Sequence, residues 1–232
     1  QLTADGLSVY TALDPQIHRG LDEGRKNALA RLKATEIDSQ GEVQLGAIIV
    51  DIPTGEIQAV LAGRDQRLGF HRVLDARRQI GSLVKPFVVA AAIEQDPRLH
   101  AGTLVRDETI SIEDDRGNVW TPKNYDKKEL GIVRLESVIA SSINQATVHL
   151  ALGLGLNRIL DRLDDLGIPV GPTRPPATLL GVSEMSPYRV AQRYQVLLNQ
   201  GHQAPLKAVR TVVDNAGSVL TRRPFQSTRL MT

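Results

Sequence analysis

Apolar and polar positions follow two different periods along the chain, and the change of period separates strands from helices. Residues 45–50 and 57–62 are short apolar runs on either side of a turn that contains Pro and Gly, which predicts a β-hairpin. Residues 206–213 and 218–221 predict a second hairpin around an Asp-Asn-Ala-Gly turn. Residues 6–13 alternate in the same way and predict one further extended segment.

Longer apolar runs between the hairpins predict helices. Asp14 and Pro15 supply an N-cap and a first helical residue, so a helix should run from there to about residue 34. Residues 81–95 are almost continuously apolar and rich in alanine, which favours a buried helix over a strand. The order of the elements predicts an α+β fold, with helices packed on a mostly antiparallel sheet. Short β-like runs are expected within 104–125. Residues 135–152 predict one helix or two in succession, and further helices are expected at 157–166 and 187–199.

Composition limits the class of protein. Of the 232 residues, 41% are hydrophobic and 23% are charged, as is usual for a globular chain with a core. The formal net charge is only +2, without the basic stripe that nucleic-acid binding requires, so no nucleic-acid partner is expected. The chain has no cysteine and its five histidines lack metal-ligand spacing, so we expect neither a metal nor a cofactor. No apolar run is long enough to span a membrane.

Ser82 and Lys85 form the first pair of residues that could carry out chemistry. They stand three apart at the start of the apolar helix, so their side chains lie on one face, one turn apart. Burial disfavours the ammonium form of a lysine and lowers its pKa, and a neutral lysine can take the proton of a serine hydroxyl. A helix-capping serine beside a surface lysine would have the same spacing, so the pair alone is a weak signal.

Ser142 and Asn144 form a second pair, within or at the end of a predicted helix. A hydroxyl and an amide two residues apart can face one cleft, where they would relay a proton and hydrogen-bond a substrate. An ordinary polar helix end would have the same composition.

Three segments carry a family resemblance, in the family's order. Residues 77–86 read Arg-Arg-Gln-Ile-Gly-Ser-Leu-Val-Lys-Pro, residues 120–126 read Trp-Thr-Pro-Lys-Asn-Tyr-Asp, and residues 141–144 read Ser-Ser-Ile-Asn. They resemble the nucleophile segment, the cleft-lining segment and the second motif of class A penicillin-binding proteins, notably those of the 1B type. The similarity runs from about Gly6 to the C-terminus, although His71 stands where the family has Asn in a Phe-Asn-Arg sequence.

The resemblance implies a fold of the penicillin-binding protein/serine β-lactamase type and an acyl transfer that cross-links peptidoglycan. The substrates would be stem peptides that end in D-Ala-D-Ala, and β-lactam antibiotics would acylate the same serine. Ser82 would be the nucleophile and Lys85 the base, with Ser142 relaying a proton and Asn144 binding the peptide or orienting Lys85. No metal or cofactor is implied. The substrate site would be lined by Gly81, Trp120, Asn124 and Tyr125.

One departure from the family concerns its third motif, Lys-Thr/Ser-Gly, which is missing from the sequence. The last lysine, Lys207, is followed by Ala208 and Val209. We therefore expect a piece of a parent protein that is inactive alone, with this motif beyond Thr232 and an incomplete sheet. Residues 1–40 would be a linker and the first helix, and residues 41–232 the transpeptidase domain. The resemblance places a glycosyltransferase domain and a membrane anchor upstream, at the periplasmic face of the bacterial inner membrane, beside other cell-wall synthesis proteins.

Three alternatives stay open at this point. A β-lactamase would need a hydrolytic base, such as a Glu in an E-x-x-x-N pattern, and none occurs between Asn144 and the proline-rich loop at 169–176. A non-catalytic penicillin sensor or cell-wall scaffold would keep the acylated serine without turnover on peptide. A structural domain with vestigial motifs is disfavoured by the intact Ser/Lys and Ser/Asn pairs.

Overall fold

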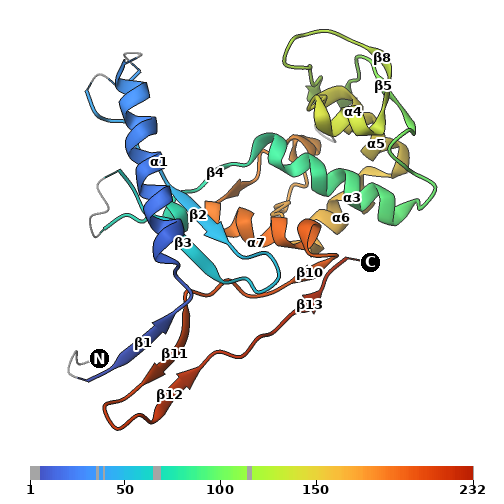
Figure 1. The fold of residues 1–232 in the computed structure, drawn as a ribbon. Coiled ribbons are helices and arrows are strands. Elements are labelled where there is room, and N and C mark those ends of the chain that lie inside the picture. The colour runs from blue at the N-terminus through green and yellow to red at the C-terminus, as the bar shows by residue number, and fades with distance from the viewer. Residues whose placement is uncertain (1–5, 35–36, 39, 65–68, 114–116, 232) are drawn as a thin grey trace. The chain divides into compact units, whose positions relative to one another are not determined.

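The structure is a computed structural model that describes residues 6–34, 37–38, 40–64, 69–113 and 117–231 (Figure 1). The chain forms two compact units, which are described separately. The first unit joins the N-terminal part, up to Arg77, to Ser186–Met231, and the second is formed by Arg78–Met185. Helices occur together with antiparallel strand pairs, so the predicted α+β fold class is confirmed.

The first unit begins with the predicted strand, helix and hairpin. Asp14 caps the helix, because its Oδ1 accepts hydrogen bonds from the backbone N–H groups of Gln16 at 2.7 Å and Ile17 at 3.1 Å. The hairpin strands are antiparallel, and within the described residues the first of them pairs only with the second. The elements are β1 (Ser8–Thr11), α1 (Pro15–Ala34), β2 (Ala47–Val50), β3 (Ile57–Leu61) and α2 (Arg72–Asp75).

The C-terminal part of the first unit consists of one helix, the second predicted hairpin and a further two-residue strand pair. Ser186 caps the helix by accepting a hydrogen bond from the N–H of Arg189 at 3.4 Å. The hairpin adds to β1 and makes a three-stranded sheet in the order β1-β11-β12 (Figure 1). The elements are α7 (Pro187–Leu198), β10 (His202–Gln203), β11 (Val209–Val213), β12 (Val219–Arg222) and β13 (Thr228–Arg229).

The second unit is built around the apolar helix α3 (Lys85–Gln95), which follows the short 3₁₀ helix η1 (Gly81–Val84). Val84, Phe87 and Val88 are at most 1% exposed, and burial of such a side chain contributes about 1.5–3 kcal/mol. Besides η1, α3 contacts α5 (Asn144–Leu154), α6 (Leu156–Asp165) and η2 (Pro176–Leu180). Of the two alternatives predicted for 135–152, the structure has two helices in succession, α4 (Leu135–Ala140) and α5, with a break at residues 141–143.

Short strand pairs complete the second unit. β5 and β8 form an antiparallel ribbon, and β6–β7 and β4–β9 are two-residue pairs. The short β-like runs predicted within 104–125 are therefore confirmed. The strands are β4 (Arg78–Gln79), β5 (Leu104–Asp107), β6 (Ile112–Glu113), β7 (Val119–Trp120), β8 (Gly131–Arg134) and β9 (Glu184–Met185).

Candidate active site

Ser82 and Lys85 lie where the 3₁₀ helix passes into α3. Ser82 is an exposed residue of η1, whereas Lys85 is the first residue of α3 and is only 2% exposed. The difference arises because the helix turns Lys85 toward the apolar core. An exposed hydroxyl thus lies one turn from a buried amine, which is the arrangement that the spacing predicted.

Lys85 Nζ is surrounded by oxygen acceptors of the second pair. It donates hydrogen bonds to the carbonyl oxygen of Ser142 at 2.5 Å, to Ser142 Oγ at 3.0 Å and to Asn144 Oδ1 at 2.6 Å. The structure therefore brings together the four residues proposed as catalytic, although they come from segments about sixty positions apart.

Ser142 connects the nucleophile candidate to the lysine. Ser142 Oγ donates to Ser82 Oγ at 2.8 Å. The side chains of Ser82 and Lys85, both in the described part of the chain, form no direct hydrogen bond, although the backbone N–H of Lys85 donates to the carbonyl oxygen of Ser82. The backbone of Ser142 has φ +54°, a left-handed conformation that is uncommon for a serine. Such local strain is typical of functional sites, and here it occurs at the residue whose carbonyl and hydroxyl both face Lys85.

Burial lowers the pKa of Lys85 from its usual 10.5 to about 8. Desolvation is the cause, since removal from water disfavours the charged ammonium. The three acceptors around Nζ favour the ammonium, but none of them carries a charge. A lysine with such a pKa can both accept and return a proton near neutral pH.

Asn124 holds the segment that carries Asn144. Its Oδ1 accepts hydrogen bonds from the backbone N–H groups of Asn144 at 2.9 Å and Gln145 at 3.1 Å. The side chain of Asn144 is held separately, because its Nδ2 donates to the carbonyl oxygen of Lys123 at 2.8 Å. Both the backbone and the amide of Asn144 are thus fixed by residues of one loop.

The family model described as "Penicillin binding protein transpeptidase domain" matches residues 45–230. The chain belongs to this family. The predicted resemblance to class A penicillin-binding proteins is confirmed.

Relatives of the 1B type cover nearly all of the chain. Penicillin-binding protein 1B of Vibrio cholerae is 39% identical over 93% of the chain, and that of Haemophilus influenzae is 38% identical over the same share. The chain spans 28% of the length of each of these two proteins.

Solved structures confirm the fold of the transpeptidase domain. Penicillin-binding protein 1A of Haemophilus influenzae has a TM-score of 0.72 and is 26% identical, over 78% of this chain and 27% of that one. The PonA1 protein of Mycobacterium tuberculosis in complex with penicillin V has a TM-score of 0.75 and is 24% identical, over 94% of this chain and 58% of that one.

The residues predicted to line the substrate site of the transpeptidase domain differ in exposure. Tyr125 is fully exposed, Trp120 is half-buried in the β6–β7 pair opposite Ile112, and Gly81 directly precedes Ser82. Substrate binding by these residues stays a prediction. Asn124 is only 8% exposed and its amide is occupied by protein groups, so its contacts favour a positioning role.

Three residues around the site were not among the predicted site residues, although the first of them lies within the cleft-lining segment at 120–126. They are Lys123, whose carbonyl holds Asn144, and Asp107 and Gln145, whose side chains hydrogen-bond Asn124. A signal existed for Asp107 alone: it lies two residues after Val105, and the two share the buried face of β5. A carboxylate at an inward strand position is a feature that period-two patterning can detect.

Gly81 and Gly181 make a close backbone approach just before the nucleophile. The N–H of Gly81 donates to the carbonyl of Gly181 at 2.9 Å, and a Cβ at residue 181 would lie 2.0 Å from the Gly81 carbonyl oxygen. Only glycine fits at residue 181, where φ is also +83°.

We therefore expect Gly181→Ala to lower the free energy of unfolding more than Gly171→Ala does. Gly171 has φ +75° and open space around it, so alanine there costs only the left-handed strain of about 1–2 kcal/mol. Gly181→Ala should cost about 1–3 kcal/mol more through overpacking. Denaturant unfolding of both variants measures the difference, and equal losses would show that the contact with Gly81 is unimportant.

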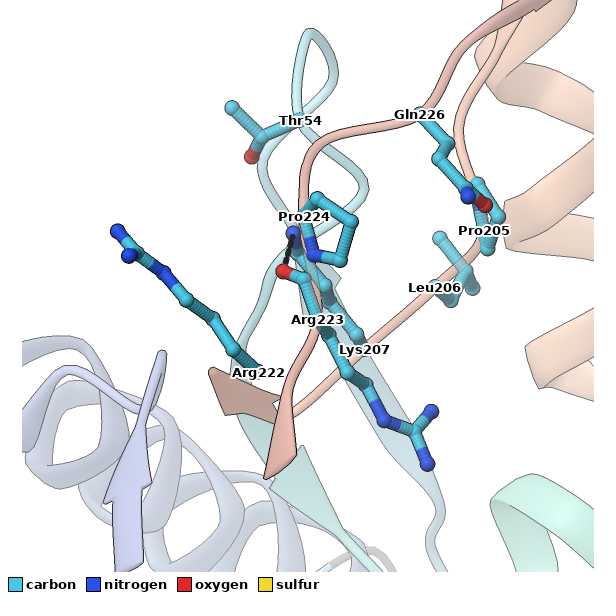
Figure 2. A pocket seen from close by; sticks show the side chains of 8 residues that line it. All are labelled: Thr54, Pro205, Leu206, Lys207, Arg222, Arg223, Pro224 and Gln226. Atoms are coloured by element: carbon cyan, nitrogen blue, oxygen red, sulfur yellow. Dashed lines mark hydrogen bonds between the residues drawn. The ribbon is translucent and has the colours of Figure 1, made fainter. Parts of the chain in front are cut away.

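The first unit contains a basic cavity of about 310 Å³ beside the hairpin turn (Figure 2). Lys207 Nζ is directed at the carbonyl oxygen of Arg223, 3.4 Å away. The side chains of Arg222 and Arg223 point to opposite sides, so they do not converge on one anion (Figure 2). The lining consists of Thr54, Pro205, Leu206, Lys207, Arg222, Arg223, Pro224 and Gln226.

Within the part of the chain that the structure describes, none of the helices combines the length and the apolar character of a membrane-spanning segment. The same residues contain no group of three or more His, Asp or Glu side chains that could hold a metal ion.

Proposed function

We propose that this domain acts as a D-Ala-D-Ala transpeptidase that cross-links peptidoglycan stem peptides through an acyl-enzyme on Ser82. The observation that carries the proposal is the hydrogen-bonded line from Ser82 Oγ through Ser142 Oγ to the buried Lys85 Nζ. A serine hydroxyl is a weak nucleophile, and such a line gives its proton a path to a base of suitable pKa.

Acylation begins with neutral Lys85. The Ser82 proton passes to Ser142, whose own proton passes to Lys85, while Ser82 Oγ bonds to the carbonyl carbon of the penultimate D-Ala. The backbone N–H of Ser82 is one donor to the oxyanion. When the peptide C–N bond breaks, the leaving amine takes a proton back from Lys85 through Ser142, and the terminal D-Ala departs.

Transfer reverses the same path. An amine of a neighbouring stem peptide attacks the Ser82 ester, gives up a proton through Ser142 to Lys85, and forms the new peptide bond. The Ser82 oxygen leaves as the alkoxide and regains a proton from Lys85. Asn144 orients Lys85 throughout, because its Oδ1 accepts the 2.6 Å hydrogen bond from Nζ. β-Lactam antibiotics acylate Ser82 by the same attack.

The setting of the domain is part of the same proposal. Residues 1–40 act as a linker and first helix, and residues 41–232 belong to the transpeptidase domain. The parent protein also polymerises glycan strands and works at the periplasmic face of the bacterial inner membrane, with other cell-wall synthesis proteins as partners. The similarity to penicillin-binding proteins of the 1B type supports this setting.

The test is release of D-Ala from a stem pentapeptide by the full-length protein. We expect D-Ala and cross-linked dimer peptide in equal amounts when an acceptor amine is present, and suppression of both products by penicillin. A protein that is labelled by penicillin but releases no D-Ala would be a sensor or scaffold. Rapid hydrolysis of the penicillin would make it a β-lactamase, and either outcome would overturn the proposal.

A further inference from the structure

Asn124 caps helix α5 from a distant loop. The residue at the N-cap position of α5 is Ile143, which has no side chain able to accept a hydrogen bond. The first N–H groups of a helix lack intrahelical partners, and Asn124 Oδ1 accepts two of them, from Asn144 and Gln145. The start of α5 is therefore positioned by residue 124 rather than by its own neighbours.

Asp107 fixes the orientation of the Asn124 amide. Its carboxylate is fully buried and accepts hydrogen bonds from Asn124 Nδ2 at 2.8 Å and from the Leu130 N–H at 2.9 Å. Asn124 Nδ2 also faces two further acceptors, Gln145 Oε1 at 2.9 Å and the Lys128 carbonyl at 2.8 Å. A reversed amide would direct its NH₂ at two backbone N–H donors, so only the observed orientation can cap α5.

The burial of Asp107 is itself informative. Among the described residues Asp107 forms no ion pair, and a buried carboxylate without a cation is costly. Hydrophobic residues would fill this inward position of β5 at lower cost. A specific polar task therefore accounts better for an acid at this place.

We propose that Asp107 and Asn124 are positioning residues that hold Asn144, and through it Lys85, in the geometry for proton transfer. The expected change in acylation rate rests on the proposed function, whereas the positioning of Asn144 and Lys85 does not. The path is short: Asp107 orients Asn124, Asn124 holds the backbone of Asn144, and Asn144 Oδ1 accepts from Lys85 Nζ at 2.6 Å.

A donor–acceptor exchange tests this path. Asn124→Asp places a carboxylate oxygen, in place of the NH₂ group, against Asp107 and the other acceptors. Asp107→Asn replaces one of the two carboxylate oxygens of residue 107 with an NH₂ group. In the double variant Asn at 107 can donate to Asp at 124, while Leu130 N–H and the α5 N–H groups keep their acceptors. We expect each single change to slow acylation by penicillin about tenfold or more per folded molecule, the effect of one lost buried hydrogen bond. The double variant should recover part of that loss, because it restores the contact with residue 107 while the Lys128 carbonyl still faces a carboxylate oxygen.

Matched controls are Asn157→Asp and Asp164→Asn, which make the same chemical changes at exposed positions of α6. Both should acylate at the original rate. All rates are compared in the full-length protein, with the folded fraction of each variant determined by thermal unfolding. Single variants that are folded and acylate at the original rate, or a double variant without recovery, would overturn the inference.

Crystal structures of the variants provide a readout that does not depend on activity. We expect the Lys85–Asn144 hydrogen bond to be broken in Asn124→Asp and re-formed in the double variant. An intact bond in Asn124→Asp would overturn the inference even if the unchanged protein proves not to react with penicillin. That lack of reaction, taken alone, would instead contradict the proposed function.

Discussion

Lys85→Ala should lower the rate of Ser82 acylation by about 10²–10⁴-fold or more, the range expected for loss of a general base. The reason is that Ser82 has no other base on its hydrogen-bonded path, since Ser142 can only pass a proton on. Stopped-flow measurement with a fluorescent penicillin gives the rate. The matched control is Lys128→Ala, which removes an exposed lysine of the same unit and keeps the backbone carbonyl that Asn124 contacts.

The pH profile of acylation provides a second check on the base. A pKa of about 8 leaves roughly one Lys85 in ten neutral at pH 7 and roughly nine in ten at pH 9. Acylation should therefore rise about tenfold between these pH values and then level off. A rate that is independent of pH over this range would contradict the assignment of Lys85 as the base.

Asn144→Ala should slow acylation less than Lys85→Ala does. This change removes one of three acceptors of Lys85 Nζ and leaves the carbonyl and hydroxyl of Ser142 in place. Equal and small losses in the two variants would mean that Lys85 is only a neighbour of Ser82.

Ser82→Ala should abolish both covalent penicillin binding and D-Ala release. No other hydroxyl is expected to replace it, because Ser142 Oγ is already the proton carrier between Ser82 and Lys85. Since Ser82 is exposed, alanine there should leave the unfolding midpoint nearly unchanged. Ser141→Ala, one residue before the relay serine and also exposed, serves as the control and should retain full labelling.

Local patterning predicted most of the elements because their causes are local. The helix from Pro15 needed only its Asp14 cap, and the hairpin of β2 and β3 needed only two apolar runs and a turn. The pair Ser82 and Lys85 was predicted to lie on one face for the same reason, since three positions make about one turn.

Features with tertiary causes could not be predicted in this way. The sequence left open whether residues 135–152 form one helix or two. The position of the break between α4 and α5 depends on the left-handed backbone of Ser142, whose carbonyl and hydroxyl both contact Lys85. Asn124 was predicted to line the substrate site. It is buried instead because it hydrogen-bonds both Asp107 of β5 and the start of α5, two elements that contact each other only in the folded chain. A single sequence contains no signal for that juxtaposition.

The central claim is that Ser82 is the residue that forms the acyl-enzyme. The most direct measurement is mass spectrometry of the full-length protein after incubation with penicillin, proteolysis and fragmentation of the modified peptide. The account predicts one adduct, on Ser82 in the peptide that contains Gly81 and Lys85, with slow release. An adduct on any other residue, or a protein that stays unmodified, would contradict it.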